Sequence, residues 1–342
     1  MEVILRAFGL NPDSFVIQPI GTGHIHKTYK LSGMPSYILQ RVNRNVFKQP
    51  EIIASNLRHT SDYLKKNFPG YSFLRAIPSK DHLEMVYDEE DFPWRLFEFR
   101  DNTITIDKVN TVQEAFSAAQ EFARLTRYLD KIDVAKFKET IPGFQDLALR
   151  FDQFKTALSA TTPERRKGAA REIQSALGFQ PLVTRYQQLI KENFLQLRIV
   201  HNDTKINNVL FDAVSGEAVC VIDLDTLMPG YFIYDLGDMV RTFVSPVSEE
   251  EKDFSKVVFR KDIYEAILSG YLSQMEGVMS DAEKKSIPFA GKMMTYIMAL
   301  RFLADYLNGN VYYHTTYPEQ NLVRAGNQLK LLEILNKEIP EL

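Results

Sequence analysis

Cysteine is almost absent from this chain: Cys220 is the one cysteine among 342 residues. A single cysteine cannot form an intrachain disulfide, which agrees with a reducing compartment. It falls in an apolar segment, where a small buried hydrophobic side chain is expected rather than a reactive thiol. The N-terminal stretch lacks the apolar core and the cleavage site of a signal peptide. Together these features predict a cytoplasmic protein.

Long hydrophobic runs and strong charge are missing too. No segment approaches the roughly 20 apolar residues of a membrane-spanning helix, so we expect no membrane association. The formal net charge is −3 and no long basic run occurs, which disfavours a nucleic-acid partner. The content of 45% hydrophobic and 25% charged residues is typical of a globular protein of about two domains. The oligomeric state is open, and a monomer is compatible with the sequence.

The most specific pattern is the segment HNDTKINN, followed by VIDLD. In a His-x-Asp-x-x-x-x-Asn segment of a phosphoryl-transfer enzyme, the aspartate (here Asp203) accepts the proton of the substrate hydroxyl, and the amide oxygen of Asn208 binds Mg²⁺. Asp223 lies twenty positions after Asp203, at the end of an apolar strand, and is the expected main Mg²⁺ ligand. Lys205, two positions after Asp203, can reach the oxygens of the phosphoryl group that is transferred. The combined spacing favours a phosphotransferase over a solvated, aspartate-rich turn.

The pattern of apolar residues predicts an α+β fold. Up to about residue 100, short apolar segments broken by turn residues indicate strands, interrupted by one helix at about 50–66. Helices dominate from Thr111 onward, and four of them are expected in the last third of the chain. We predict a β-rich nucleotide-binding lobe at 1–100 and a helical catalytic and substrate-binding lobe at 101–342. The four late helices are expected at 233–243, 261–275, 287–307 and 318–336.

These motifs resemble those of the aminoglycoside phosphotransferase and choline kinase group, which shares the two-lobe protein-kinase fold. Within that group, HNDTKINNVLFD, VIDLDTLMPG and YDLGDMVR, with GTGHIHKTY and YILQRVN upstream and MALRFLADYLNGNVYY downstream, are similar to the bacterial N-acetylhexosamine 1-kinases. The resemblance covers roughly residues 15–315. It implies ATP and Mg²⁺ as cofactors, and it implies phosphorylation of the anomeric hydroxyl of GlcNAc or GalNAc.

The first hundred residues also offer candidates for nucleotide binding. Gly21 and Gly23 lie between two expected strands, as in a loop that covers phosphates, although a plain hairpin turn fits as well. The strand lysine that normally pairs with the α and β phosphates is missing. Arg41 lies at about the right distance, but a solvated arginine is an equal alternative. Phe97 and Phe99 fall where adenine would bind, and they either sandwich the base or pack between the lobes.

Three further acids have open roles. Asp225 either touches a second metal ion or caps a turn. Asp238 is expected to accept hydrogen bonds from the backbone of the segment around Asp203. Glu51 is either the partner of Arg41 or a favourable charge at the start of its helix.

The resemblance to the hexosamine kinases implies sugar contacts for His24 and Arg301, for Tyr312 and for the base Asp203. Arg301 and Asp305 are four residues apart on one helix, so an ion pair between them is a competing interpretation.

Several other functions are weighed against this one. The nearest is a kinase for another small alcohol, such as a neutral sugar, homoserine, choline or an aminoglycoside. A choline or aminoglycoside site is expected to show an acidic or aromatic cage, and the C-terminal region has no obvious acidic cluster. A pseudokinase would lack a catalytic carboxylate, and none is missing. Protein-kinase activity is disfavoured because no Ala-Pro-Glu element follows Asp223.

Overall fold

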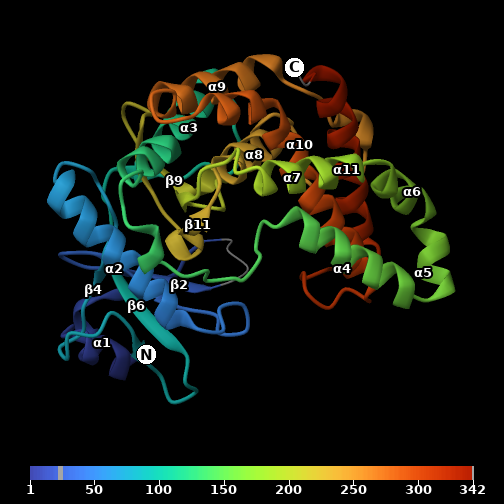
Figure 1. Ribbon diagram of the computed structural model, residues 1–342. Coiled ribbons are helices and arrows are strands. Elements are labelled where there is room, and N and C mark those ends of the chain that lie inside the picture. Colours follow the sequence, from blue (N-terminus) through green and yellow to red (C-terminus); the bar gives the residue numbers. More distant parts are fainter. Residues whose placement is uncertain (22–25, 341–342) are drawn as a thin grey trace. The chain divides into compact units, whose positions relative to one another are not determined.

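The computed structural model describes residues 1–21 and 26–340, and it has the predicted α+β composition (Figure 1). The chain divides into two compact units. The predicted boundary between two lobes, at 1–100 and 101–342, stays a prediction. Unit 1 comprises Met1–Ile104, Lys131–Pro142 and Leu210–Pro229, and unit 2 comprises Thr105–Asp130, Gly143–Val209 and Gly230–Leu342.

Unit 1 contains a six-stranded antiparallel sheet in the order β1-β2-β3-β6-β4, with β5 paired to β6. Successive side chains of a strand point to opposite faces. One face packs with helix α1 (Glu2–Ala7) into a core that includes Leu31, Leu39, Trp94 and Leu96. The strands are β1 (Val16–Pro19), β2 (Lys27–Ser32), β3 (Tyr37–Arg41), β4 (Ala76–Ile77), β5 (Val86–Tyr87) and β6 (Pro93–Glu98).

Helix α2 (Pro50–Asn67) begins at a proline, which suits the first position of a helix because its missing N–H is not needed there. It matches the helix predicted at about 50–66. Its buried Asn56 donates to the backbone oxygens of Lys138 and Leu227 and accepts from the N–H of Lys138. This one amide thereby joins the three stretches of chain that form unit 1.

Unit 1 also holds a small sheet that leads toward Asp223. Its strands follow the order β10-β9-β7, namely β7 (Thr103–Ile104), β9 (Val209–Asp212) and β10 (Ala218–Val221). Two further short strands lie outside this sheet: β8 (Arg198–Val200), which belongs to unit 2, and β11 (Met228–Gly230).

Unit 2 is helical and is organised around α10 (Asp281–Leu307), a helix of 27 residues that packs against α4, α8 and α11 (Figure 1). The prediction placed its start at residue 287. The helix begins earlier because Ser280 and Glu283 form a capping box, and it continues through Pro288. The other helices are α3 (Val112–Tyr128), α4 (Leu147–Ala160), α5 (Pro163–Gly168), α6 (Ala170–Gly178), α7 (Pro181–Lys191), α8 (Phe232–Phe243), α9 (Lys261–Met275) and α11 (Gln320–Glu338).

Close packing of α8 on α10 depends on a glycine. A methyl group at Gly237 would collide with the backbone oxygen of Ala290 and would lie 2.9 Å from the Cβ atom of Met294. We expect Gly237→Ala to lower the free energy of unfolding by about 3 kcal/mol, since overpacking against backbone is hard to relieve. Urea unfolding followed by circular dichroism measures this. Gly277→Ala is the control, because nothing lies within 4 Å of its added methyl group; equal stability losses for both variants would contradict the packing argument.

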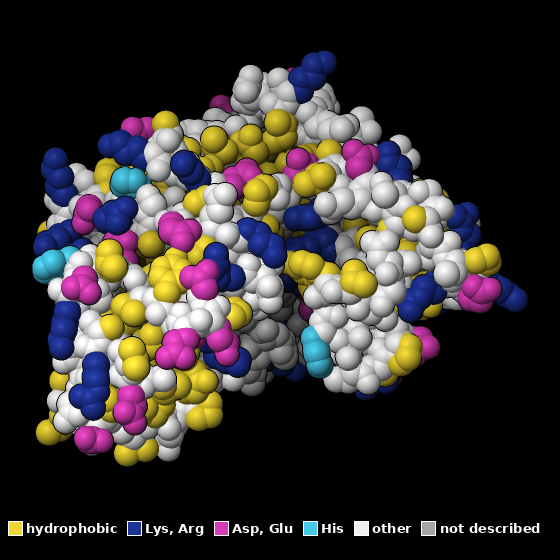
Figure 2. All heavy atoms as spheres, turned by 90° about the horizontal axis from the view of Figure 1, so that it is seen from below, with side chains coloured by type: hydrophobic (Ala, Val, Ile, Leu, Met, Phe, Trp, Pro, Cys, Tyr) yellow, Lys and Arg dark blue, Asp and Glu magenta, His cyan; other side chains and the backbone are white. Residues whose placement is uncertain are grey.

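Within residues 1–21 and 26–340, no helix combines the length and the apolar character that crossing a membrane requires. On the face drawn in Figure 2, acidic and basic side chains lie mixed among one another.

Candidate active site

The HNDTKINN segment lies in unit 2 and is held by two carboxylates of helix α8. Asp235 accepts hydrogen bonds from the backbone N–H groups of His201 (3.0 Å) and Asn202 (2.7 Å). Asp238 accepts from the N–H of Thr204 at 2.9 Å, which confirms its expected role. Burial raises the pKa of Asp235 to about 6, although both amides favour its charged form. The role of Asp235 was missed, because its spacing does not distinguish it from Asp238.

Asp203 and Lys205 face each other, with Oδ1 of the acid 3.4 Å from Nζ of the lysine. Both side chains are partly exposed. Burial alone would raise the pKa of Asp203, but Lys205, His201 and Arg241 outweigh it, so this pKa lies below its usual value. The Asp203 charge in turn raises the pKa of Lys205. Near neutral pH the pair is therefore a carboxylate beside an ammonium group.

Asn208 completes this part of the site. Its side-chain Nδ2 donates to the backbone oxygen of Asp203 at 2.9 Å, so its amide oxygen is directed away from that bond. An amide oxygen is a ligand that Mg²⁺ accepts. The loop therefore brings together Asp203, Lys205 and Asn208, as the spacing predicts.

Lys205→Met is expected to shift the acidic limb of the pH profile of kcat/KM to higher pH. Among the neighbouring groups that lower the pKa of Asp203, the Lys205 charge is the largest. A base of low pKa stays ionised as the pH falls, and loss of an opposite charge raises such a pKa by about 1 unit or more. Lys205→Arg keeps the charge and should leave the limb in place. A limb that does not move in Lys205→Met would contradict this electrostatic coupling.

Asp223 lies in unit 1 directly after the strand β10 and Ile222, as predicted. Its side chain is exposed, and its backbone is left-handed, with φ 57° and ψ 55°. Few residues other than glycine adopt this conformation, and aspartate is among those that tolerate it. The turn thus presents a carboxylate to solvent at the end of a strand.

Asp225, two residues on, has neighbours that the sequence did not suggest. It is buried, with Oδ2 2.7 Å from Nε2 of His26 and Oδ1 2.5 Å from Nη1 of Arg95. These neighbours hold the pKa of Asp225 far below its usual value, against the effect of burial. Asp225 is therefore the centre of a buried charge cluster. Sequence reasoning missed Arg95, since nothing in its local pattern distinguishes it from other strand residues.

The side chains in unit 1 that fit a metal ion can be compared directly. Possible ligand atoms of His26, Asp223 and Asp225 lie within 4.8 Å of one another. His26 and Asp225 are already engaged with each other, and Asp225 also pairs with Arg95. The Asp223 carboxylate is exposed, and such a group suits Mg²⁺, which prefers oxygen ligands and keeps several waters.

The other candidate residues for nucleotide binding differ in their surroundings. Gly21 has φ 83°, a backbone conformation that favours glycine. Gly23 and His24 lie outside the described residues. The ring of Phe97 lies 5.2 Å from the guanidinium of Arg95, and the ring of Phe99 lies 3.7 Å from Nζ of Lys30. Both rings are half-buried.

Arg41 has acidic partners instead of an open position. Its Nε lies 3.0 Å from Oδ2 of Asp88, a second nitrogen pairs with Glu90, and the guanidinium covers the ring of Phe92 at 3.8 Å. Glu51, for which pairing with Arg41 was one of two alternatives, accepts a hydrogen bond from the hydroxyl of Tyr87 at 2.5 Å. The structure therefore does not bring Arg41 and Glu51 together.

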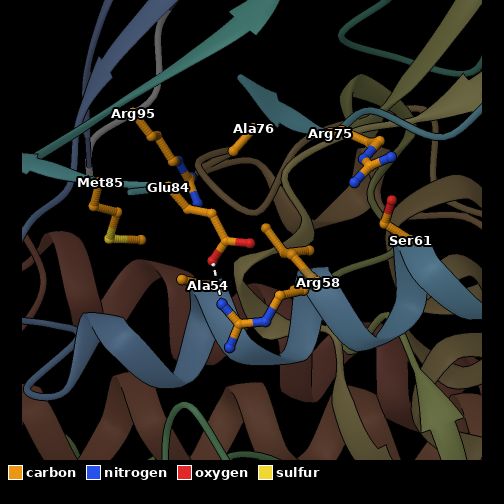
Figure 3. A pocket seen from close by; sticks show the side chains of 9 residues that line it. Ala54, Arg58, Ser61, Arg75, Ala76, Glu84, Met85 and Arg95 are labelled. Atoms are coloured by element: carbon orange, nitrogen blue, oxygen red, sulfur yellow. Dashed lines mark hydrogen bonds and ion pairs between the residues drawn. The ribbon is translucent and has the colours of Figure 1, made fainter. Parts of the chain in front are cut away.

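A small pocket in unit 1 adjoins Arg95 (Figure 3). An ion pair between Arg58 and Glu84, with 3.0 Å between Nη1 and Oε2, lies among its lining side chains. The lining residues are Ala54, Leu57, Arg58, Ser61, Arg75, Ala76, Glu84, Met85 and Arg95.

The predicted sugar contacts Arg301 and Tyr312 lie close together in unit 2. The guanidinium carbon of Arg301 is 5.1 Å from the ring of Phe144, 5.6 Å from that of Tyr313 and 6.0 Å from that of Tyr312. The competing ion pair with Asp305 does not form. The Asp305 carboxylate instead accepts the backbone N–H groups of the segment 311–313, at 2.9 to 3.0 Å.

Arg150 of α4 is a further cation in this region that sequence reasoning missed. It donates to the backbone oxygens of Phe144 (2.8 Å) and Gly143 (3.0 Å). Burial and the neighbouring charge of Arg301 lower the pKa of Arg150 to about 10. Nothing in the sequence around Arg150 indicates that it lies near Arg301.

The chain belongs to the phosphotransferase enzyme family (APH), whose pattern matches residues 16–256. It is therefore an enzyme, a phosphotransferase of the aminoglycoside and choline kinase group that acts on an alcohol group of a small molecule.

Solved structures confirm the kinase-like fold. The chain is similar to a microcompartment-associated aminopropanol kinase, with a TM-score of 0.63 and 15% identity over 100% of this chain and 98% of that chain. It is also similar to the amicoumacin kinase hAmiN, solved with AMP-PNP, Ca²⁺ and Ami (TM-score 0.61, 17% identity, 96% and 90% covered). A third is the spectinomycin phosphotransferase APH(9)-Ia with ADP and spectinomycin (TM-score 0.60, 13% identity, 100% and 97% covered).

Proposed function

We propose that this phosphotransferase uses MgATP to phosphorylate the anomeric hydroxyl of an N-acetylhexosamine, GlcNAc or GalNAc, giving the sugar 1-phosphate and ADP. The observation that carries the phosphoryl-transfer part is the loop in which Asp203, Lys205 and Asn208 lie together, fixed by Asp235 and Asp238. The choice of sugar rests on the sequence resemblance.

Asp203 is the proposed base. It orients the hydroxyl on the anomeric carbon and accepts its proton as the bond to phosphorus forms. An anomeric hydroxyl is more acidic than an ordinary alcohol, so a carboxylate of low pKa is sufficient. The Lys205 ammonium, 3.4 Å from Asp203, is placed to neutralise charge on the transferred phosphoryl group.

Asn208 and Asp223 are the proposed Mg²⁺ ligands, and bound Mg²⁺ supplies neutralisation of the β and γ phosphates. Gly21 and Gly23 would cover the phosphates, and Phe97 and Phe99 would contact adenine. The use of ATP is supported by the AMP-PNP and ADP bound to the relatives hAmiN and APH(9)-Ia.

Arg301 and Tyr312 are the proposed sugar contacts, together with His24 and Asp203. Among the residues that the structure describes, no carboxylate pairs with Arg301, so its planar guanidinium can donate to the acetamido oxygen of the sugar. The surrounding aromatic rings suit the C–H face of a pyranose.

Charge in this region argues against the amine-bearing acceptors after which several relatives are named. A cationic acceptor would be repelled by positive charges beside it. Here the neighbouring charges of Arg150 and Arg301 are both positive. This supports an acceptor that is uncharged or anionic, and it favours the sugar over the alternatives choline and aminoglycosides. A neutral sugar and homoserine remain alternative acceptors.

A panel of acceptors with detection of ADP release tests this assignment. The panel contains GlcNAc, GalNAc, glucose, galactose, homoserine, choline, ethanolamine and spectinomycin. We expect kcat/KM for an N-acetylhexosamine to exceed that of every other acceptor, with phosphate on the anomeric oxygen by ³¹P NMR. Preference for an amine-bearing alcohol, or phosphate on another hydroxyl, would refute the proposed substrate.

A further inference from the structure

The third strand of the main sheet carries a glutamine where a cation is expected. Gln40 of β3 stands opposite Thr28 of β2 and Arg95 of β6. Its Nε2 donates to Oγ1 of Thr28 at 3.1 Å, and its Oε1 accepts from Nε and Nη2 of Arg95 at 2.9 and 2.5 Å. These three side chains therefore share the sheet face opposite the core formed with α1, and Arg95 places a positive charge at the end of the Gln40 side chain.

The charge on Arg95 is deeply buried and compensated. Arg95 is 2% exposed, and its carboxylate partner Asp225 is also 2% exposed, with 2.5 Å between Nη1 and Oδ1. Asp225 has a second partner in His26, whose Nδ1 accepts the backbone N–H of Asn43 at 3.0 Å. The other ring nitrogen of His26, Nε2, lies 2.7 Å from Oδ2 of Asp225. Taking both charges out of water is costly, and their mutual attraction repays this cost only when the geometry is good.

We propose that Arg95 is the cation that this chain directs at the phosphate groups of the nucleotide, in place of the missing lysine on β3, with Gln40 fixing its orientation and Asp225 as its counter-ion. This inference rests on the proposed use of ATP. An arginine has five N–H groups in a planar fork that matches phosphate oxygens. The contacts with Gln40 and Asp225 occupy only part of them, which leaves donors for a phosphate.

Two other cations in the same sheet fit this role less well. Arg41 is paired with Asp88 and Glu90, and strand alternation puts it on the face opposite to Gln40. Lys30 is two positions along β2 from Thr28, and its ammonium group is already engaged with the ring of Phe99.

The choice of counter-ion has a structural consequence. In protein kinases the strand lysine pairs with a helix glutamate. Here Glu51 of α2 bonds to Tyr87 instead, and the acid that holds the cation lies two residues after the candidate metal ligand Asp223. Arg95 is thereby tied to the turn at Asp223 and, through Asp225, to His26, and not to helix α2.

Calorimetric titration with MgATP and, separately, with adenosine tests the proposal, because adenosine has the base and ribose but no phosphate. For Arg95→Gln we expect ATP affinity to fall about 10- to 100-fold, as for loss of hydrogen bonds to a charged group, with adenosine affinity within about twofold of wild type. Arg95→Lys should keep part of the ATP affinity. The loss of ATP affinity in Arg41→Gln should be at least tenfold smaller than the loss in Arg95→Gln.

A second variant covers the case in which Arg95→Gln fails to fold with Asp225 left uncompensated. Arg95→Gln/Asp225→Asn leaves no unpaired charge and should show the same selective loss for ATP. Equal losses for ATP and adenosine, no loss for either, or a larger loss in Arg41→Gln would overturn the role of Arg95. If the wild-type protein itself does not bind MgATP, the proposed function fails, whatever the variants do.

Discussion

Asp203→Asn is expected to lower kcat by a factor of about 10² to 10⁴, which is the usual contribution of a general base. Asparagine has the same shape, and the backbone of the loop is held by Asp235 and Asp238, so the loop geometry should survive. The change removes the atom that takes the proton of the hydroxyl. Affinity for MgATP, measured by calorimetry, should change little, so that the loss appears in kcat.

The control for this variant is Asp152→Asn, an exposed acid of the same unit that pairs with Lys155. It should leave both kcat and nucleotide affinity at wild-type values. If Asp203→Asn retained a kcat within about threefold of wild type, Asp203 would not be the base.

Asp223→Asn is expected to reduce kcat/KM by about 10³, because a bound metal ion supplies several kcal/mol of charge stabilisation and each tenfold corresponds to 1.36 kcal/mol. Asparagine tolerates the left-handed backbone of this position, so the effect reports loss of a charged ligand and not backbone strain. Titration with Mn²⁺ in the presence of ATP, followed by electron paramagnetic resonance, should show weaker metal binding in the variant.

A matched control is available elsewhere in the same unit. Asp91 has φ 61° and is exposed, so Asp91→Asn makes the same chemical change in the same backbone conformation. Metal affinity and turnover should be unchanged there. Wild-type Mn²⁺ affinity in Asp223→Asn would remove Asp223 from the metal site.

Local motifs predicted much of this protein. The spacing in HNDTKINN fixes which side chains share one loop, because short segments allow few conformations, and Asp203, Lys205 and Asn208 do lie together. The apolar run before Asp223 predicted its strand. The regular pattern of apolar residues likewise placed helix α2 within one residue.

Contacts between distant residues were not predictable in this way. Arg95 and Asp225 are far apart in the sequence, and their pairing depends on the sheet register that sets Arg95 beside Gln40. A one-residue shift of register would turn every side chain to the other face. The spacing of Arg41 likewise left open whether it binds phosphate or is solvated, and its contacts with Asp88 and Glu90 come from residues far along the chain.

Local spacing also left one alternative open. Arg301 and Asp305 have the spacing of a helix ion pair, which on an exposed helix face stabilises by only about 0.3–0.5 kcal/mol, whereas Asp305 is buried. The backbone N–H groups of Val311, Tyr312 and Tyr313 offer Asp305 three hydrogen bonds instead. No helical pattern encodes a loop that folds back onto its own helix.

The most direct test is a crystal structure with Mg²⁺, AMP-PNP and GlcNAc bound. We expect the amide oxygen of Asn208 and the carboxylate of Asp223 at about 2.0–2.1 Å from the same Mg²⁺, and Asp203 at about 2.6–3.2 Å from the anomeric oxygen. A metal ion held by other residues, or a sugar whose anomeric oxygen is out of reach of Asp203, would contradict the account.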